Sequence, residues 1–316
     1  MRVILDTDMG MGVPGTEIDD GFALALIAAD DEFELDMVTT VNGNIDVESG
    51  TYLSRELLQR LGREEVPVFR GASAPLAEPE RGRVAPGAIR ERFGHHRPNP
   101  GYAAAEIARC VVESPGEITI IAIGPLTNIA AAINLDERVA SSVKEIVIMG
   151  GAFQQHTNLL HMPGEFNFWV DAVAARAVMR SGAPLRLVGL DATLKVRLTR
   201  EHAAAMSASG RSFGAFAGES TTAWIDAMAA KMPGDPAHAD SCAMHDPLAV
   251  AAVSHPELLE WAPACVDVIA SDEAGRGIAV ADLLMHADSP APNAHIAVDV
   301  DVDGFMTYFL NRISNY

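Results

Sequence analysis

Short runs rich in Val, Ile and Leu alternate with longer runs rich in Ala and Leu along most of the chain. The short runs predict buried strands at Val3–Asp6, Leu35–Val41, Ile118–Ile123, Glu145–Met149 and Leu185–Asp191. The longer runs predict helices at Asp20–Ala29, Val47–Leu61, Ala103–Val112, Leu126–Asn134 and Ala172–Ser181. This alternation predicts an α/β fold in which a mostly parallel central sheet has helices on both faces.

The remaining segments have weaker patterns of secondary structure. Ala77–Pro100 is rich in Arg, Pro and Gly and lacks a clear period, so we expect a long surface loop. Residues 199–240 suggest helices with a break at Pro233–Pro236, and the chain ends with a predicted strand, Ile296–Val300, and helix, Val302–Ile313. Because no repeat or low-complexity linker occurs, we expect one domain over residues 1–316.

Composition and charge narrow the possible partners. Of the 316 residues, 49% are hydrophobic, and 43 acidic against 23 basic residues give a net charge of −20. An acidic surface repels phosphate backbones and anionic lipids, so nucleic acid and membranes are disfavoured as partners, whereas a cation is not. Cys110, Cys242 and Cys265 are widely spaced, which predicts no disulfide framework. The start of the chain lacks a signal-peptide pattern, so we expect a cytoplasmic protein.

Four aspartates lie where the first strand ends and the next helix begins: Asp6, Asp8, Asp19 and Asp20. Capping of the helix N-terminus would explain one of the last two. It does not explain Asp6 and Asp8 at the end of a buried strand. Carboxylates brought together repel one another unless a cation or protons intervene, so the cluster favours a hard divalent ion such as calcium or magnesium.

The same segment contains a GxGxxG pattern, Gly10–Gly15, which is typical of dinucleotide-binding loops. Acidic residues flank it on both sides and would repel a pyrophosphate. Pro14 also removes one of the N–H groups that a phosphate-binding loop uses. The second predicted strand ends without an acidic residue for a ribose hydroxyl, so the pattern does not favour NAD binding.

Six motifs in order resemble the inosine–uridine-preferring nucleoside hydrolase family. They are Asp6-Thr7-Asp8 with Asp19-Asp20, Val41-Asn42-Gly43-Asn44, Gly124-Pro125-Leu126-Thr127-Asn128, Met149-Gly150-Gly151, Glu165-Phe166-Asn167 with Asp171, and His245-Asp246-Pro247-Leu248-Ala249. The likeness extends over nearly the whole chain. It implies the family's fold and hydrolysis of ribonucleosides to ribose and a free base, in purine or pyrimidine salvage.

The resemblance also implies roles for individual residues. Calcium would be bound by Asp8, Asp20, Asp246 and the main-chain carbonyl of Thr127, and Asp8 would also accept the proton of the attacking water. Asp6 would support the residues that bind the ion without binding the ion itself. The residues implied to contact the substrate, with core packing as the alternative for Met149 and turn roles for several others, are Asp19, Asn44, Met149, Asn158, Glu165 and Asn167.

His245 is the predicted proton donor to the leaving base. It precedes the implied metal ligand Asp246, and an imidazole titrates near neutral pH. Base preference is expected to depend on loops around residues 80–100 and 210–240. The resemblance further implies a homo-oligomer, either a dimer or a tetramer.

Two other functions fit parts of the pattern. A calcium-stabilised ribose- or nucleoside-binding protein without catalysis would need the same fold, although the complete acidic set favours an enzyme. Aspartyl-phosphate hydrolases also carry DxD after a first strand, but a Thr or Val usually stands where this chain has Gly10. The second alternative is therefore the weaker one.

The chain departs from the family in the loop after the first strand. Ten residues, Met9–Ile18, separate Asp8 from Asp19 where the family usually has only a few, and Gly21 stands in place of the usual Ala. Loop lengthening costs little free energy, about 0.6 kcal/mol per doubling. We expect this loop to form part of the pocket wall or a lid, with a solvent-facing bulge as the alternative.

Overall fold

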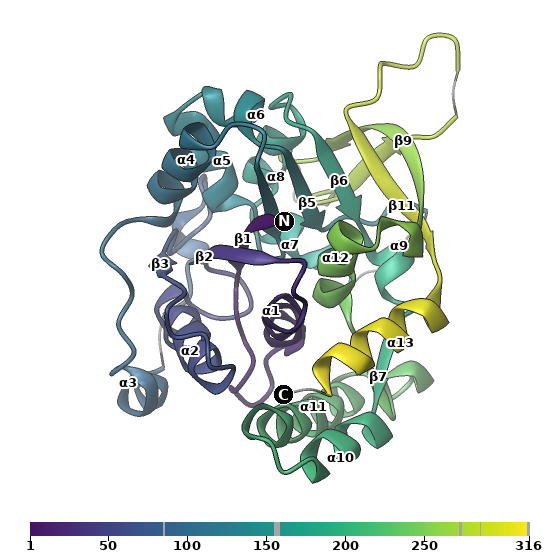
Figure 1. Ribbon diagram of the computed structural model, residues 1–316. Coiled ribbons are helices and arrows are strands. Elements are labelled where there is room, and N and C mark those ends of the chain that lie inside the picture. The colour runs from purple at the N-terminus through teal and green to yellow at the C-terminus, as the bar shows by residue number, and fades with distance from the viewer. Residues whose placement is uncertain (85, 155–158, 272–273, 285, 315–316) are drawn as a thin grey trace.

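A nine-stranded sheet forms the centre of the computed structural model, which describes residues 1–84, 86–154, 159–271, 274–284 and 286–314 (Figure 1). Its strands lie in the order β10-β9-β11-β6-β5-β4-β1-β2-β3. They are β1 Arg2–Thr7, β2 Glu34–Thr40, β3 Val68–Arg70, β4 Ile118–Ala122, β5 Glu145–Met149, β6 Leu185–Val188, β9 Leu259–Val268, β10 Ala279–Asp282 and β11 Ala294–Val300. Two further short strands, β7 Arg197–Thr199 and β8 Ser241–Ala243, form a separate antiparallel pair.

The pairing from β3 to β11 is parallel throughout, and only β9 and β10 add antiparallel pairings at one edge. The predicted α/β class and mostly parallel sheet are therefore confirmed. Both faces of the sheet are buried. Because successive side chains of a strand point to opposite faces, neighbouring residues enter different core clusters. In β1, Val3 and Leu5 enter one core cluster while Ile4 enters the other.

Helices cover both faces of the sheet (Figure 1). One layer contains α1 Asp19–Ala29, α2 Val47–Arg60, α12 His245–Ser254 and α13 Val302–Ile313, and α10 Arg200–Ala208 and α11 Ser212–Lys231 pack on the outer side of this layer (Figure 1). The other contains α4 Ala103–Glu113, α5 Thr127–Leu135, α6 Arg138–Ser142 and α8 Ala172–Met179. Shorter helices are α3 Gly87–Phe93, α7 Phe166–Val170, α9 Leu190–Thr193, η1 Pro79–Arg81, η2 Pro236–His238 and η3 Pro256–Leu258. No helix among the described residues is long and apolar enough to cross a membrane.

The structure corrects the sequence prediction in two segments. Ala77–Pro100 is not a continuous loop, because it contains η1 and α3, and α3 buries Ile89 and Phe93 one helical turn apart. The predicted strand Leu185–Asp191 ends at Val188, and Leu190 begins the short helix α9. Strands β3, β7, β8, β9 and β10 were not predicted, since they are short or lie at the antiparallel edge with one face partly exposed.

The order of the strands places a crevice beside β1. The chain continues from β1 to β2 and β3 on one side, then returns to β4, β5 and β6 on the other side. In parallel α/β sheets such a reversal opens a crevice at the carboxyl ends of the strands, where ligands bind. The residues after β1 therefore lie at the favoured position for a site.

The ten-residue loop after Asp8 packs into the protein at its start and is exposed at its tip. Met9 and Met11 are 0% and 1% exposed and belong to the core, whereas Pro14 and Gly15 face solvent. Gly12 adopts φ +108°, a conformation that favours glycine. The first half of the loop is thus not the solvent-facing bulge of the alternative prediction.

Candidate active site

Asp8 follows β1 directly and is 1% exposed. Its Oδ2 accepts a hydrogen bond from the backbone N–H of Asn44 at 2.6 Å, after β2. Its Oδ1 is buried without a hydrogen-bond partner among the described residues. A buried carboxylate oxygen without a donor is expensive, so this atom indicates that a proton or a cation belongs beside it.

Asp19 and Asp20 occupy the first turn of α1, and both are buried. Asp20 accepts hydrogen bonds from the Thr7 hydroxyl and from Nδ2 of Asn44, the latter at 3.1 Å. Asp19 Oδ2 accepts the backbone N–H of Asp246 at 3.1 Å, where α12 begins. Two helix N-termini that are distant in sequence therefore meet through their carboxylates.

Asp19, Asp20 and Asp246 form a buried acidic cluster in which each carboxylate offers an oxygen within 4.8 Å of the others. Burial, followed by the charges of Asp19 and Asp20, raises the pKa of Asp246 well above its usual value. Burial and the charge of Asp20 likewise raise the pKa of Asp8. These carboxylates are therefore poorly accommodated as bare anions, and their oxygen-only donor set fits a hard divalent cation.

Asp6 lies one residue before the strand end and is completely buried. Its Oδ1 accepts hydrogen bonds from the Thr39 hydroxyl at 2.5 Å and from Nδ2 of Asn128 at 2.7 Å. Asn128 Oδ1 in turn accepts the backbone N–H of Ala72 at 2.9 Å. Asp6 thus links β1 to β2 and α5, which agrees with a supporting role, and Asn128 is a structural partner that the sequence did not single out.

Thr127 begins α5 and is 2% exposed. Its hydroxyl donates to Oδ2 of Asp171 at 2.8 Å. Asp171 also caps α8 by accepting the backbone N–H of Ala174 at 3.0 Å. These contacts fix the position of the turn that carries the predicted ligand carbonyl.

Glu165 and Asn167 are buried at the start of α7. Glu165 caps this helix, and its carboxylate accepts the backbone N–H groups of Asn167 at 2.8 Å, Phe168 at 3.1 Å and Gly151 at 3.2 Å. Asn167 Nδ2 donates to the carbonyl of Met149 at 3.2 Å. Met149 is itself 4% exposed and packs in the core. Asn158 lies outside the described residues.

His245 is the first residue of α12, directly before Asp246. Its Nδ1 shares a hydrogen bond of 2.7 Å with the Thr193 hydroxyl, and its Nε2 lies 3.9 Å from Oε1 of Glu17. Burial, followed by the charge of Arg197, lowers the pKa of His245 to about 4. The imidazole is therefore neutral near pH 7, in contrast to the sequence-based expectation of a group that titrates there. A neutral ring whose Nδ1 accepts from Thr193 presents Nε2–H as a donor.

Two residues beside the site were not assigned a role from the sequence. Thr193 lies at the end of α9, two residues beyond the predicted strand Leu185–Asp191, and no motif in the sequence included it. Glu17 precedes Asp19 by two positions, and burial and the charges of Asp19 and Asp20 raise its pKa. The sequence shows that Glu17 belongs to the acidic segment. Its approach to His245 depends on how α1 and α12 pack, which the sequence does not show.

This chain belongs to the inosine-uridine preferring nucleoside hydrolase family, whose model matches residues 3–307. The RihC protein of Escherichia coli, a non-specific ribonucleoside hydrolase, is 31% identical over 314 residues, which cover 98% of this chain and 96% of RihC. An uncharacterised protein of Schizosaccharomyces pombe is 32% identical and covers 99% of both chains. The predicted family and enzyme class are therefore confirmed.

Solved structures show the same fold. A plant nucleoside hydrolase, PpNRh1, aligns with a TM-score of 0.86 at 28% identity, covering 100% of this chain and 99% of the plant chain. A purine-preferring ribonucleoside hydrolase from Gardnerella vaginalis aligns with a TM-score of 0.85 at 29% identity, covering 100% of this chain and 98% of that chain. The likeness extends across the whole chain, including both helix layers and the antiparallel edge.

Proposed function

We propose that this protein is a calcium-dependent ribonucleoside N-ribohydrolase that releases ribose and a free nucleobase. The observation that carries the proposal is the buried set of Asp8, Asp19, Asp20 and Asp246, with Oδ1 of Asp8 lacking a partner among the described residues. Membership of the nucleoside hydrolase family and the ribonucleoside hydrolase names of its relatives support the reaction. The ion itself is inferred from the carboxylate oxygens, which calcium prefers.

The proposed reaction replaces the bond between the ribose anomeric carbon and the base nitrogen by a bond to a water oxygen. Calcium, when bound by Asp8, Asp20, Asp246 and the Thr127 carbonyl, would offset their charge and position the water and ribose hydroxyls. Asp8 would accept the water proton at Oδ1, the atom that has no hydrogen-bond partner in the described part of the chain. The ribose would pass through an oxocarbenium-like state, as in glycoside hydrolysis.

The ribose would be held by polar groups around this cluster. Asp19, Asn44, Glu165 and Asn167 come from α1, the turn after β2 and the start of α7. Their side chains are already oriented by hydrogen bonds within the protein, such as that from Asn44 to Asp20. Preorganisation of this kind reduces the entropy lost when the reactants are aligned.

His245 would assist departure of the base. As a neutral imidazole held by Thr193, it would donate a hydrogen bond from Nε2 to the nitrogen that acquires negative charge. This interaction strengthens as the bond breaks, so it stabilises the transition state more than the bound substrate. The proton that completes the base would then come from solvent, since a neutral imidazole can donate a hydrogen bond but has no acidic proton to transfer.

Ribose release from a panel of purine and pyrimidine nucleosides tests the proposal. The enzyme would be assayed after exhaustive chelation, after restoration with calcium, and after restoration with magnesium. We expect activity to be lost on chelation and restored by calcium. Full turnover by the metal-free protein would refute the metal requirement. Binding of nucleosides without any turnover in calcium would instead favour the non-catalytic binding protein.

A further inference from the structure

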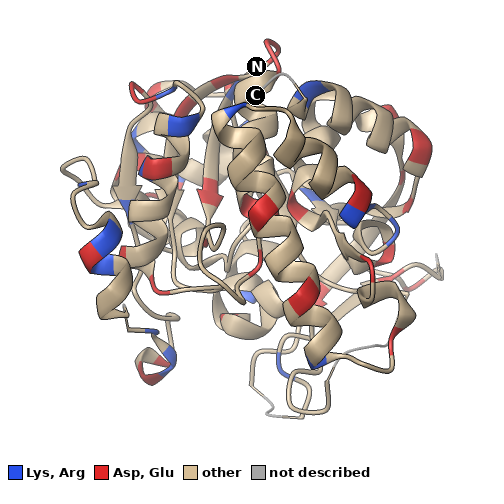
Figure 2. Cartoon of the chain, turned by 90° about the horizontal axis from the view of Figure 1, so that it is seen from below, with Lys and Arg blue, Asp and Glu red and all other residues tan. Residues whose placement is uncertain are grey.

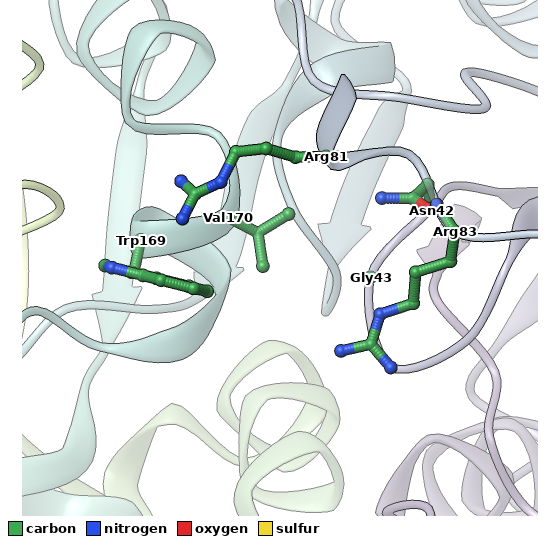
Figure 3. A pocket seen from close by; sticks show the side chains of 6 residues that line it. All are labelled: Asn42, Gly43, Arg81, Arg83, Trp169 and Val170. Atoms are coloured by element: carbon green, nitrogen blue, oxygen red, sulfur yellow. Dashed lines mark hydrogen bonds between the residues drawn. The ribbon is translucent and has the colours of Figure 1, made fainter. Parts of the chain in front are cut away.

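A pocket with a volume of about 240 Å³ opens between the turn after β2 and the end of α7 (Figure 3). It is lined by Asn42, Gly43, Arg81, Arg83, Trp169 and Val170. Gly43 on one wall directly precedes Asn44, and Trp169 on the opposite wall lies two residues after Asn167, so the pocket is near two proposed ribose contacts in the chain. Pockets for whole small-molecule ligands usually measure about 300–1,000 Å³, so this volume suits one substituent of a substrate better than a complete molecule.

The pocket lies close to the proposed general base. At Gly43 a Cβ atom would stand 2.0 Å from Oδ2 of Asp8, so the backbone there comes into contact with that carboxylate. The next residue, Asn44, donates its backbone N–H to the same oxygen. A group bound in the pocket is therefore within reach of a ribose placed at Asp8.

The polar side chains that line the pocket are hydrogen-bond donors. Figure 3 shows the Arg81 guanidinium beside the Trp169 ring at one wall and the Arg83 guanidinium at the opposite wall, near Gly43. The Oδ1 atom of Asn42 accepts the backbone N–H of Arg83 at 2.7 Å, which leaves its amide nitrogen as a donor pointing into the pocket (Figure 3). A wall of donors without a carboxylate is suited to an anion.

Both arginines are held in place by contacts that leave donors available. The Arg81 guanidinium stacks on the Trp169 ring, 4.2 Å from the ring centroid. One nitrogen of Arg83, Nη1, donates to the backbone carbonyl of Asn44 at 2.8 Å. Planar guanidinium groups fixed in this way match the geometry of phosphate or carboxylate oxygens, and less entropy is lost when they bind.

The local charge balance is opposite to that of the whole chain. Glu78 forms an ion pair with Arg276 and lies 3.5 Å from Nη1 of Arg81, so one carboxylate serves two guanidinium groups. Among the described residues, Arg83 takes part in no ion pair. The net charge of the chain is −20, and acidic residues are spread over many helices and loops (Figure 2). The pocket lining itself carries two arginines and no carboxylate, which favours an anionic ligand.

We propose that the pocket binds an anionic group carried by the nucleoside substrate, so that the enzyme prefers anionic nucleosides to neutral ones. This inference rests on the proposed function. The anionic group has two possible positions on a nucleoside, a phosphate on the 5′-oxygen or an acidic substituent on the base. In either case, Arg81 and Arg83 would donate charge-assisted hydrogen bonds to its oxygens.

Matched pairs of substrates test the inference. Inosine 5′-monophosphate is compared with inosine, uridine 5′-monophosphate with uridine, and orotidine with uridine, as ratios of kcat/KM in the calcium-loaded enzyme. We expect at least one anionic member to exceed its neutral counterpart. Arg81→Gln and Arg83→Gln should each lower that ratio by about 10- to 100-fold, the value of a hydrogen bond to a charged group. If the arginine variants lower the kcat/KM ratio only for the monophosphates, the anionic group is the 5′-phosphate on the ribose. If they lower it only for orotidine, the anionic group is on the base.

Arg138→Gln is the matched control, because the exposed Arg138 lies on α6 and pairs with Asp136 away from the pocket. Its ratios should equal those of the unmodified enzyme. Arg83→Gln also removes the hydrogen bond to the Asn44 carbonyl, but this affects both substrates of a pair and cancels in the ratio. Thermal unfolding would confirm that each variant is folded. If a variant does not fold, stronger competitive inhibition of the unmodified enzyme by ribose 5-phosphate than by ribose, or by orotate than by uracil, supports the inference.

Two results would overturn the inference. One is hydrolysis of inosine or uridine with no preference for any anionic partner. The other is a preference that survives both arginine substitutions. Either result leaves the proposed function intact, because neutral nucleosides are still cleaved. Failure of every nucleoside to release ribose, and of every nucleotide to release ribose 5-phosphate, in calcium would instead refute the proposed function.

Discussion

Asp8 combines two roles in the proposed reaction, as a ligand of the cation and as the acceptor of the water proton. Its Oδ2 is held by the backbone of Asn44, which leaves Oδ1 for chemistry. We expect Asp8→Asn to lower kcat by about 10²- to 10⁴-fold, the usual contribution of a positioned general base. Steady-state hydrolysis of inosine and uridine measures the loss.

Loss of the ion would mimic loss of the base, so the calcium content of Asp8→Asn must be measured in the same preparation. Asp226→Asn is the control, since Asp226 is exposed on α11 and pairs with Arg200. A well-folded, calcium-loaded Asp8→Asn enzyme with unreduced kcat would show that another group accepts the proton.

His245 should matter most for leaving groups that depart poorly. With its pKa lowered to about 4, the ring acts as a neutral donor across the range from pH 5 to 8. We expect His245→Ala to lower kcat/KM for inosine by roughly 100-fold or more, and for 4-nitrophenyl riboside by less than about tenfold. The nitrophenolate leaves without assistance, so it gains little from the hydrogen bond.

The exposed His295 on β11 provides the control variant His295→Ala, which should hydrolyse both substrates normally. Thr193→Val removes the hydroxyl that holds Nδ1 and should reproduce part of the selective loss. Equal losses on inosine and the nitrophenyl substrate would assign His245 a structural role and exclude it from leaving-group assistance.

The lengthened loop and the first helix are adapted to each other. At Gly21 on α1 a Cβ atom would lie 2.3 Å from Sδ of Met11, which the loop buries against the helix. This contact gives a physical reason for glycine where the family usually has alanine. We expect Gly21→Ala to lower the free energy of unfolding by about 1–3 kcal/mol through overpacking. Denaturant unfolding of the two proteins would measure this difference in the free energy of unfolding.

A double-mutant cycle identifies the contact. In the Met11→Ala background, Gly21→Ala should destabilise less, because Sδ and Cγ are gone and only the Cβ of residue 11, at 2.8 Å, remains close. Gly50→Ala is the matched control in α2, where the nearest atom to the added Cβ lies at 3.5 Å. There the substitution should be stabilising, by about 0.5–1 kcal/mol. Additive effects of the Met11 and Gly21 substitutions would contradict the proposed contact.

At the level of the whole molecule, the acidic cluster should couple stability to calcium and to pH. Without the ion, burial and the charge of Asp20 raise the pKa of Asp19 to about 7. The native state then binds more protons than the unfolded state from about pH 4 to 7, so stability falls as pH rises through this range. Calcium competes with these protons and should stabilise more at pH 8 than at pH 5.

Thermal unfolding measures this coupling. We expect calcium at about 100-fold excess over its Kd to raise the Tm by roughly 5 °C or more at pH 8. The shift should be smaller at pH 5 and should largely disappear in Asp246→Asn. An equal shift at both pH values, or an unchanged shift in Asp246→Asn, would place the calcium elsewhere.

Much of the architecture followed from local pattern. The strand at Glu145–Met149 agrees with the predicted bounds, and β1, β2 and β4 agree to within a residue, because runs buried on both faces are uniformly apolar. The edge strand β9 has one face partly exposed, and β3, β7 and β8 have three residues each, so their patterns were too weak to predict. Helix α3 was missed within a segment dominated by Arg, Pro and Gly.

The motifs by themselves determined the family and predicted an acidic site suited to an oxygen-ligated cation, since residue type and order carry that information. Only the tertiary structure decided which side chains meet. It brought Asp246 to Asp19, set Thr193 and Glu17 around His245, and packed Met11 on Gly21. It also joined the turn after β2 to the end of α7, so that Arg81 and Arg83 face one pocket. These contacts depend on how helices and loops pack across the sheet, and packing between distant segments leaves no local signal in a single sequence.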